Sequence, residues 1–125
     1  MECDDPLVMY IVLRKDLLTA LHWPLGAVAV QAAHAATKCV ADFAPDPMVQ
    51  RYLSAANRDA MRKVMCSADS SEELLRIGDN LRQSGVDFSL WVEQPEGIAT
   101  CLATKPAPKS ALKSVRTLRQ LPLFR

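Results

Sequence analysis

Glycine, aromatic residues and long apolar runs are all scarce in this sequence. Only 4 of the 125 residues are glycine, and no glycine-rich phosphate-binding loop, Gly-x-Ser-x-Gly elbow or RNP-like motif occurs. No apolar run approaches the roughly 20 residues that cross a bilayer. The acidic start, Met1–Asp5, also differs from a basic signal or transit peptide. We therefore expect a cytoplasmic protein that does not enter a membrane.

Cysteine is sparse too, and its spacing is not that of a disulfide framework. The cysteines form no CxxC pair, and the sequence offers only two histidines as further metal ligands. A zinc site would need ligands from several distant elements. We expect reduced thiols packed in the core, and a functional site without a metal or organic cofactor. The cysteines are Cys3, Cys39, Cys66 and Cys101.

No acidic residue follows Thr104, although the net charge of the whole chain is only +1. The end of the chain is therefore basic, and the remainder is net acidic. Such local charge attracts anions to one region of the protein, which fits binding of a nucleic-acid backbone or an acidic partner better than non-specific binding. The basic residues after Thr104 are Lys105, Lys109, Lys113, Arg116, Arg119 and Arg125.

Apolar patterning predicts one α/β domain over residues 1–125. The order is strand, helix, helix, strand, helix, strand, strand, helix, which describes a mixed four-stranded sheet flanked by helices. The expected strands are 7–13, 61–67, 88–93 and 98–104. The expected helices are 27–43, 48–56, one opened by the cap residues 69–73 and ending at Gly85, and a basic helix over 109–121.

The first expected strand, Leu7–Leu13, is a continuous apolar run of the kind that is buried on both faces. It ends in Arg14, Lys15 and Asp16. Ligands of open α/β sheets bind outside the carboxyl ends of strands, so these three are candidate substrate-binding residues. Arg14 and Asp16 point the same way and can simply pair, or Arg14 can offer its remaining donors to a phosphate.

The expected helix 27–43 has two distinct faces. On its polar face, the imidazole of His34 can relay a proton, and the amide of Gln31 can hold a water or a substrate carbonyl. A hydrogen-bonded structural histidine is the alternative. The polar face consists of Ala27, Gln31, His34 and Lys38, and the small-residue packing face of Val28, Ala32, Ala35, Cys39 and Phe43.

The two strands 88–93 and 98–104 are close enough to form an antiparallel hairpin. Alternation places Trp91 and Glu93 on one face. Glu93 can orient or deprotonate a water, and burial beside Trp91 would raise its pKa; a solvated hairpin carboxylate is the alternative. Thr100 offers a hydroxyl near the hairpin, or only its strand propensity.

Several short motifs occur in a recognisable order: Val12–Leu17, Gly26, Gln31–Ala36, Lys63–Val64, Thr100 and Pro106–Pro108. Their combination resembles the type II peptidyl-tRNA hydrolases, in which a strand ends in Arg-x-Asp and a glycine opens a helix with Gln-x-x-His-Ala. The local sequence around Trp23–Pro24 and Leu90–Glu96 is more similar to a divergent branch of the family, the peptidyl-tRNA hydrolase domain-containing proteins. The resemblance implies a compact α/β domain, commonly a dimer, that hydrolyses the ester linking a peptide to tRNA.

Two positions depart from that family. Ala27 stands where the main enzymes have a lysine, so a cation near the phosphate or the oxyanion is missing. The family's Asp-Ala-Gly loop aligns with Glu93–Pro95 followed by a deletion, which keeps a carboxylate in a shortened loop. Lys15 or Lys38 can partly replace the missing lysine.

The first hypothesis is a peptidyl-tRNA hydrolase with Glu93 and His34 as its catalytic pair. Its rival is a non-catalytic RNA- or protein-binding domain that keeps the fold. The expected partners are tRNA or peptidyl-tRNA, and a second copy of the chain. The candidate substrate-binding residues are Arg14, Lys15, Asp16, Gln31 and Thr100, and the candidate contacts to the tRNA backbone are Lys38, Lys109, Lys113 and Arg116.

Overall fold

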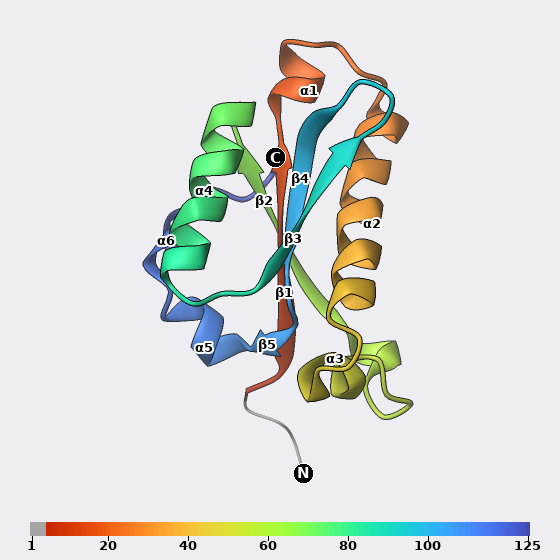
Figure 1. The fold of residues 1–125 in the computed structure, drawn as a ribbon, viewed down its shortest axis with the longest axis vertical. Helices are drawn as coiled ribbons and strands as arrows, with labels where there is room; N and C mark the ends of the chain where they lie inside the picture. Colours follow the sequence, from red (N-terminus) through yellow and green to blue (C-terminus); the bar gives the residue numbers. More distant parts are fainter. Residues whose placement is uncertain (1–4) are drawn as a thin grey trace.

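The computed structural model describes residues 5–125, so Cys3 lies outside the described residues. The predicted α/β fold, a mixed sheet flanked by helices, is confirmed (Figure 1). The strands are β1 Leu7–Arg14, β2 Arg62–Ala68, β3 Phe88–Glu93, β4 Ile98–Thr104 and β5 Ala107–Pro108. The helices are α1 Asp16–Thr19, α2 Leu25–Asp42, α3 Pro47–Tyr52, α4 Ser71–Gln83, α5 Lys109–Lys113 and α6 Arg116–Gln120, with a 3₁₀ turn, η1, at Arg58–Ala60.

The sheet is built around β1. This strand pairs in parallel with β2 on one side and antiparallel with β4 on the other, and β4 pairs antiparallel with β3. The resulting order, β2-β1-β4-β3, leaves β2 and β3 at the edges. The predicted hairpin of 88–93 and 98–104 is confirmed at both strands. The short β5 was not predicted, because two residues that include a proline carry no periodicity; it pairs with the start of β1.

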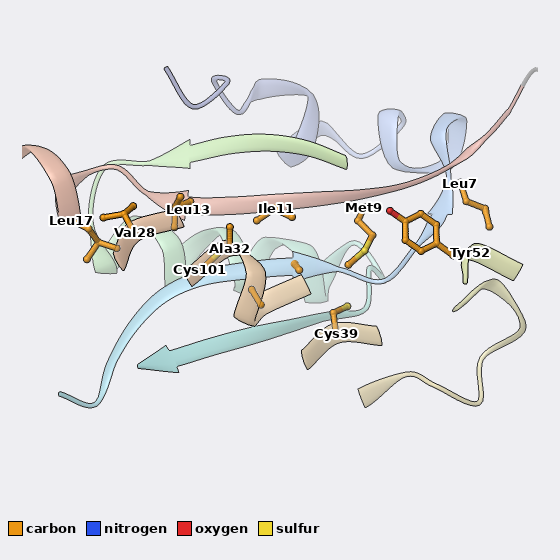
Figure 2. Close-up of a cluster of buried hydrophobic side chains, with 12 residues drawn as sticks. Leu7, Met9, Ile11, Leu13, Leu17, Val28, Ala32, Cys39, Tyr52 and Cys101 are labelled. Atoms are coloured by element: carbon orange, nitrogen blue, oxygen red, sulfur yellow. The ribbon is translucent and has the colours of Figure 1, made fainter. Parts of the chain in front are cut away.

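β1 is buried along its whole length because helices cover both faces of the sheet (Figure 1). Its odd-numbered side chains, from Leu7 to Leu13, belong to the core beneath α2. Its even-numbered side chains, from Val8 to Val12, belong to the core beneath α4, α5 and α6. Figure 2 shows the first core, with the odd-numbered side chains in a row along β1. The apolar run therefore contributes side chains to both hydrophobic cores.

α2 covers β4 and β3 and begins two residues before the predicted helix. Its packing face is confirmed, since Val28, Ala32, Ala35 and Cys39 are all buried. Small side chains at these positions let the helix lie close to the sheet. The adjoining face of α2, which carries Gln31 and His34, is thereby brought over the β3–β4 hairpin.

The prediction of packed, unbridged thiols is confirmed for the three described cysteines, Cys39, Cys66 and Cys101, which are free and buried. Burial raises the pKa of Cys39 and that of Cys66 to about 11. Burial also raises the pKa of Cys101. All three thiols are therefore neutral at physiological pH and act as small apolar core groups.

The helix predicted over 48–56 is wrong in its second half, because α3 ends at Tyr52. The side-chain amide of Asn57 donates to the carbonyl oxygen of Tyr52 at 2.9 Å and so takes the place of a helical donor. Tyr52 is fully buried and donates its hydroxyl to the carbonyl oxygen of Arg62 at 2.9 Å. Both contacts join the end of α3 to the chain that leads into β2.

The single basic helix predicted over 109–121 is also wrong. Two short helices, α5 and α6, are separated by Ser114 and Val115, and the backbone of Val115 is extended at φ −80° and ψ 113°. The reason lies in Leu112 and Leu118, which are both buried in the core beneath α4. On a continuous helix these two side chains would point about 120° apart, at about 100° per residue. The break lets both face the sheet.

A buried side chain completes the hydrogen bonding of β1 where β4 diverges from it. The hydroxyl of Thr104 accepts from the backbone N–H of Tyr10 at 2.9 Å. We expect Thr104→Val, which keeps the shape and removes the acceptor, to lower the free energy of unfolding by about 1–3 kcal/mol. Urea denaturation measures this loss. Thr104→Ser, which keeps the hydroxyl, should retain most of the stability, and equal losses in both variants would contradict the role of this bond.

Candidate functional site

Five side chains from three elements meet between the first half of α2 and the β3–β4 hairpin. Strand alternation and helix spacing bring them together, since Trp91 and Glu93 project from β3 toward α2 while Gln31 and His34 lie one turn apart on the helix. Hydrogen bonds and ring stacking connect all of them. We call this set the Gln31 network; its members are Gln31, His34, Trp91, Glu93 and Thr100.

Gln31 is the centre of the network, and its side chain is only 1% exposed. Its Nε2 donates to a carboxylate oxygen of Glu93 at 2.9 Å and to the carbonyl oxygen of Ala27 at 3.2 Å. Its Oε1 accepts from the hydroxyl of Thr100 at 2.8 Å. Both amide hydrogens are therefore engaged by the protein. This geometry suits an amide that fixes Glu93 more than one that grips a substrate carbonyl.

Thr100 reaches the network because of a β-bulge. Trp91 pairs with Cys101 and Val92 with Ala99, so Thr100 is an extra residue of β4 without a partner on β3. A bulge turns a side chain toward the other face of a sheet. Here it directs the fully buried Thr100 hydroxyl to Gln31 on the α2 face. Nothing in the sequence signalled this bulge.

Trp91 holds both Glu93 and His34. Its indole Nε1 donates to the second carboxylate oxygen of Glu93 at 3.0 Å. Its ring stacks on the imidazole of His34, with ring centroids 4.4 Å apart and planes inclined by 20°. His34 and Glu93, which come from different elements, are thus placed beside one another through a shared neighbour. The ring of His34 is partly exposed.

The pKa of Glu93 is lowered, whereas the sequence predicted that it would be raised. The hydrogen bond from Gln31 contributes most, followed by that from Trp91, and these outweigh the opposing effect of burial. Donors that bond to a carboxylate favour its charged form. The charge of His34 lowers the pKa further. Glu93 is therefore an ionised carboxylate that hydrogen bonds hold in one orientation, and it is only a weak base at neutral pH.

Arg14 and Asp16 form the pair that sequence reasoning offered as one interpretation. The guanidinium donates through Nε and Nη2 to both carboxylate oxygens of Asp16, at 2.9 and 2.7 Å. Its Nη1 donates to the carbonyl oxygen of Ala99 at 3.0 Å. Ala99 precedes Thr100, so the outgoing end of β1 is joined to the strand that carries the network. Arg14 is 6% exposed, which leaves little of it for a ligand.

The two lysines near the site differ in their surroundings. Lys38 lies one turn beyond His34 on α2 and forms an ion pair with Asp42 at 2.6 Å. Asp42 also accepts from the hydroxyl of Ser89 at 2.6 Å, a link to β3 that the sequence did not reveal. Lys15 lies at the N-cap of α1 and is half-buried, and it forms no ion pair with any residue of the range 5–125.

The predicted backbone contacts Lys109, Lys113 and Arg116 are not brought to the Gln31 network. They lie on α5 and α6, which cover the face of the sheet opposite α2 (Figure 1). The break at Val115 also removes the common helical stripe that was predicted for them. Within the described part of the chain, no group of three or more His, Cys, Asp or Glu side chains could hold a metal ion. No helix in that part is long and apolar enough to cross a membrane.

Comparison with known proteins gives consistent matches. The family model of peptidyl-tRNA hydrolase PTH2 matches residues 7–124. Human and mouse proteins named "Putative peptidyl-tRNA hydrolase PTRHD1" are 45% identical over 104 residues and 42% identical over 120 residues. These alignments cover 82% and 95% of this chain, and 73% and 83% of the relatives. A Thermococcus onnurineus protein named "Peptidyl-tRNA hydrolase" is 28% identical over 110 residues, which cover 84% of this chain and 88% of that protein.

The lowered pKa of Glu93 depends on its two donors, and one of them can be removed cleanly. Trp91→Phe keeps an aromatic ring beside His34 and deletes the indole N–H, so we expect the pKa of Glu93 to rise toward its ordinary value of 4.5. Titration of the side-chain carboxyl carbon by ¹³C NMR measures this. Trp23→Phe is the matched control and should leave the pKa of Glu93 unchanged. An unchanged value in Trp91→Phe would refute the assignment of this hydrogen bond.

Proposed function

Because this chain belongs to the peptidyl-tRNA hydrolase PTH2 family, we propose that it hydrolyses the ester bond between a peptide and the 3′ end of tRNA. The relatives carry the family's name, and the observation that supports the activity here is the Gln31 network. It holds a carboxylate and an imidazole side by side at the end of the sheet where open α/β folds bind their ligands.

In the proposed reaction, His34 takes a proton from a water molecule whose oxygen attacks the ester carbonyl carbon. The tetrahedral intermediate then collapses, the bond to the ribose 3′ oxygen breaks, and this oxygen receives the proton from His34. A free acid and a tRNA with its 3′ hydroxyl are released. An imidazole is suited to both transfers because it exchanges a proton near neutral pH with little driving force.

Glu93 has a supporting role in this mechanism. Its carboxylate oxygens accept from the side chains of Gln31 and Trp91, and a carboxylate has about four lone-pair sites, so it can also accept from the attacking water. Its negative charge also stabilises the imidazolium that forms when His34 takes the proton. Gln31 and Thr100 act one step further away, since they hold Glu93 in place and do not bond to the water.

Ala27 has no charge, so the negative charge of the oxyanion or of the terminal phosphate has to be stabilised by other residues. Lys38 is paired with Asp42, and most donors of Arg14 bond to Asp16 and Ala99. Lys15, at the outgoing end of β1, is the cation that we assign to the oxyanion or the terminal phosphate. Lys109, Lys113 and Arg116 would reach tRNA only if it passed around the sheet to the other face.

Substitution of the two proposed catalytic side chains tests the activity. His34→Asn and Glu93→Gln should each lower the rate of peptide release from purified peptidyl-tRNA by about 100-fold or more, because general acid–base catalysis contributes about 10²–10⁴-fold. His22→Asn and Glu96→Gln are matched controls, since both side chains are exposed and lie outside the network. His22 has φ +56°, a conformation that asparagine tolerates. No turnover by the wild type would favour a non-catalytic binding domain.

The pH dependence separates the roles of the two side chains. The pKa of Glu93 lies below 4.5, so Glu93 stays ionised throughout the neutral range and cannot produce an acid limb there. We expect Glu93→Gln to lower the plateau of kcat/KM and to leave the shape of the pH profile unchanged. Steady-state rates of the wild type and this variant between pH 5 and 9 measure this. A limb that disappears in Glu93→Gln would assign the proton transfer to Glu93.

A further inference from the structure

A cavity of about 350 Å³ lies beneath α6, on the face of the sheet opposite the Gln31 network. α4 packs mainly over β4 on this face, so the neighbouring part of β1 and β2 is covered by α6 and the C-terminal tail, 121–125. This cover is incomplete. The volume falls within the range of about 300–1,000 Å³ that is usual for small-ligand pockets.

The floor and walls of this cavity are apolar. Cys66 is buried, and its pKa is raised to about 11, so the thiol adds no charge at neutral pH. Leu123 lines the cavity and is 50% exposed, so part of the apolar wall is open to solvent. The apolar lining consists of Tyr10, Val64, Cys66, Leu118, Leu121 and Leu123.

Two cations line the same cavity, and among residues 5–125 no carboxylate lines it. Lys113 ends α5 and Arg119 lies in α6. The guanidinium of Arg119 donates through Nη1 to the carbonyl oxygens of Lys113 and Ser114, both at 3.3 Å. This contact is made because the chain breaks at Val115, which folds α6 back toward the end of α5. The break therefore gathers two positive side chains beside one apolar hollow.

We infer that this cavity binds a small amphipathic anion, of the class of medium-chain carboxylates, with its chain on the leucine walls and its carboxylate between Lys113 and Arg119. A neutral apolar molecule would leave both cations without a counter-charge. An inorganic anion would leave the apolar walls empty. Pockets that are mostly apolar with a few convergent polar groups are the usual form of small-molecule sites. The inference does not depend on the proposed function.

A second hollow, of about 290 Å³ between α2, α3 and the start of β2, is the competing site. Its lining is apolar except for Thr37 and Lys63, together with the hydroxyl of Tyr52. The ammonium of Lys63 already lies over the ring of Tyr52, 5.3 Å from its centroid. This hollow thus offers a single cation, which already contacts the ring of Tyr52, so it suits the same anion less well.

The test compares three probes that separate the charge from the chain. Octanoate carries both a carboxylate and a hydrocarbon chain, 1-octanol carries only the hydrocarbon chain, and acetate carries only the carboxylate. Titrations followed by ¹H–¹⁵N NMR should show saturable binding of octanoate, at least tenfold tighter than that of either other probe. The amides that shift should be those around Tyr10, Cys66 and Leu118, and those around Val40 and Leu53 in the competing hollow should stay unchanged.

Variants then locate the carboxylate. Lys113→Gln should weaken octanoate binding about tenfold, whereas Arg116→Gln, a matched change on the exposed surface of α6, should leave it unaltered. Arg119→Lys, which keeps the charge, should retain most of the affinity. Val64→Phe fills the hollow and should abolish binding, with far-UV circular dichroism to verify the fold. The inference is overturned by absent or non-saturable binding, by equal binding of 1-octanol, by shifts confined to the competing hollow, or by full affinity in Lys113→Gln.

Discussion

The organisation of the site depends on one buried amide. Gln31 joins α2 to β3 through Glu93 and to β4 through Thr100, while its second amide hydrogen returns to its own helix. An amide with three engaged groups in a buried setting has one orientation, because any rotation would leave a polar atom unpaired. The positions of Glu93 and, through Trp91, of His34 follow from it. A helix that slid along the sheet would lose the bonds from Gln31 to Glu93 and to Thr100 together.

The same bonds that position Glu93 also determine its chemistry. Two donors stabilise the carboxylate and lower its pKa, so the residue gains a fixed orientation and loses basicity. In the proposed mechanism the Glu93 anion therefore has the supporting role, and the neighbouring imidazole of His34 carries the proton. The stacked indole serves both side chains, through its N–H and through its ring face.

The two faces of the sheet have different characters. The α2 face carries the Gln31 network and the ion pair between Lys38 and Asp42, whereas the opposite face carries the basic helices α5 and α6 and the cavity beneath α6. β1 contributes to both faces, since its odd-numbered side chains pack into the core beneath α2 and its even-numbered side chains pack into the core on the other face. A ligand beneath α6 would touch Tyr10, whose neighbours in β1 pack under α2.

The sequence by itself determined the features that arise from local pattern. The apolar run at 7–13, the alternation at 88–93 and the small-residue stripe of α2 were readable because burial repeats with the period of the element. Tertiary structure alone decided the rest. The bulge at Thr100 and the largest contribution to the lowered pKa of Glu93 depend on Gln31, which lies far along the chain in α2, and the break at Val115 depends on the core into which Leu112 and Leu118 both pack. Local periodicity in the sequence does not reveal such tertiary partners. The candidate residues could therefore be named from the sequence, but the contacts between them could not.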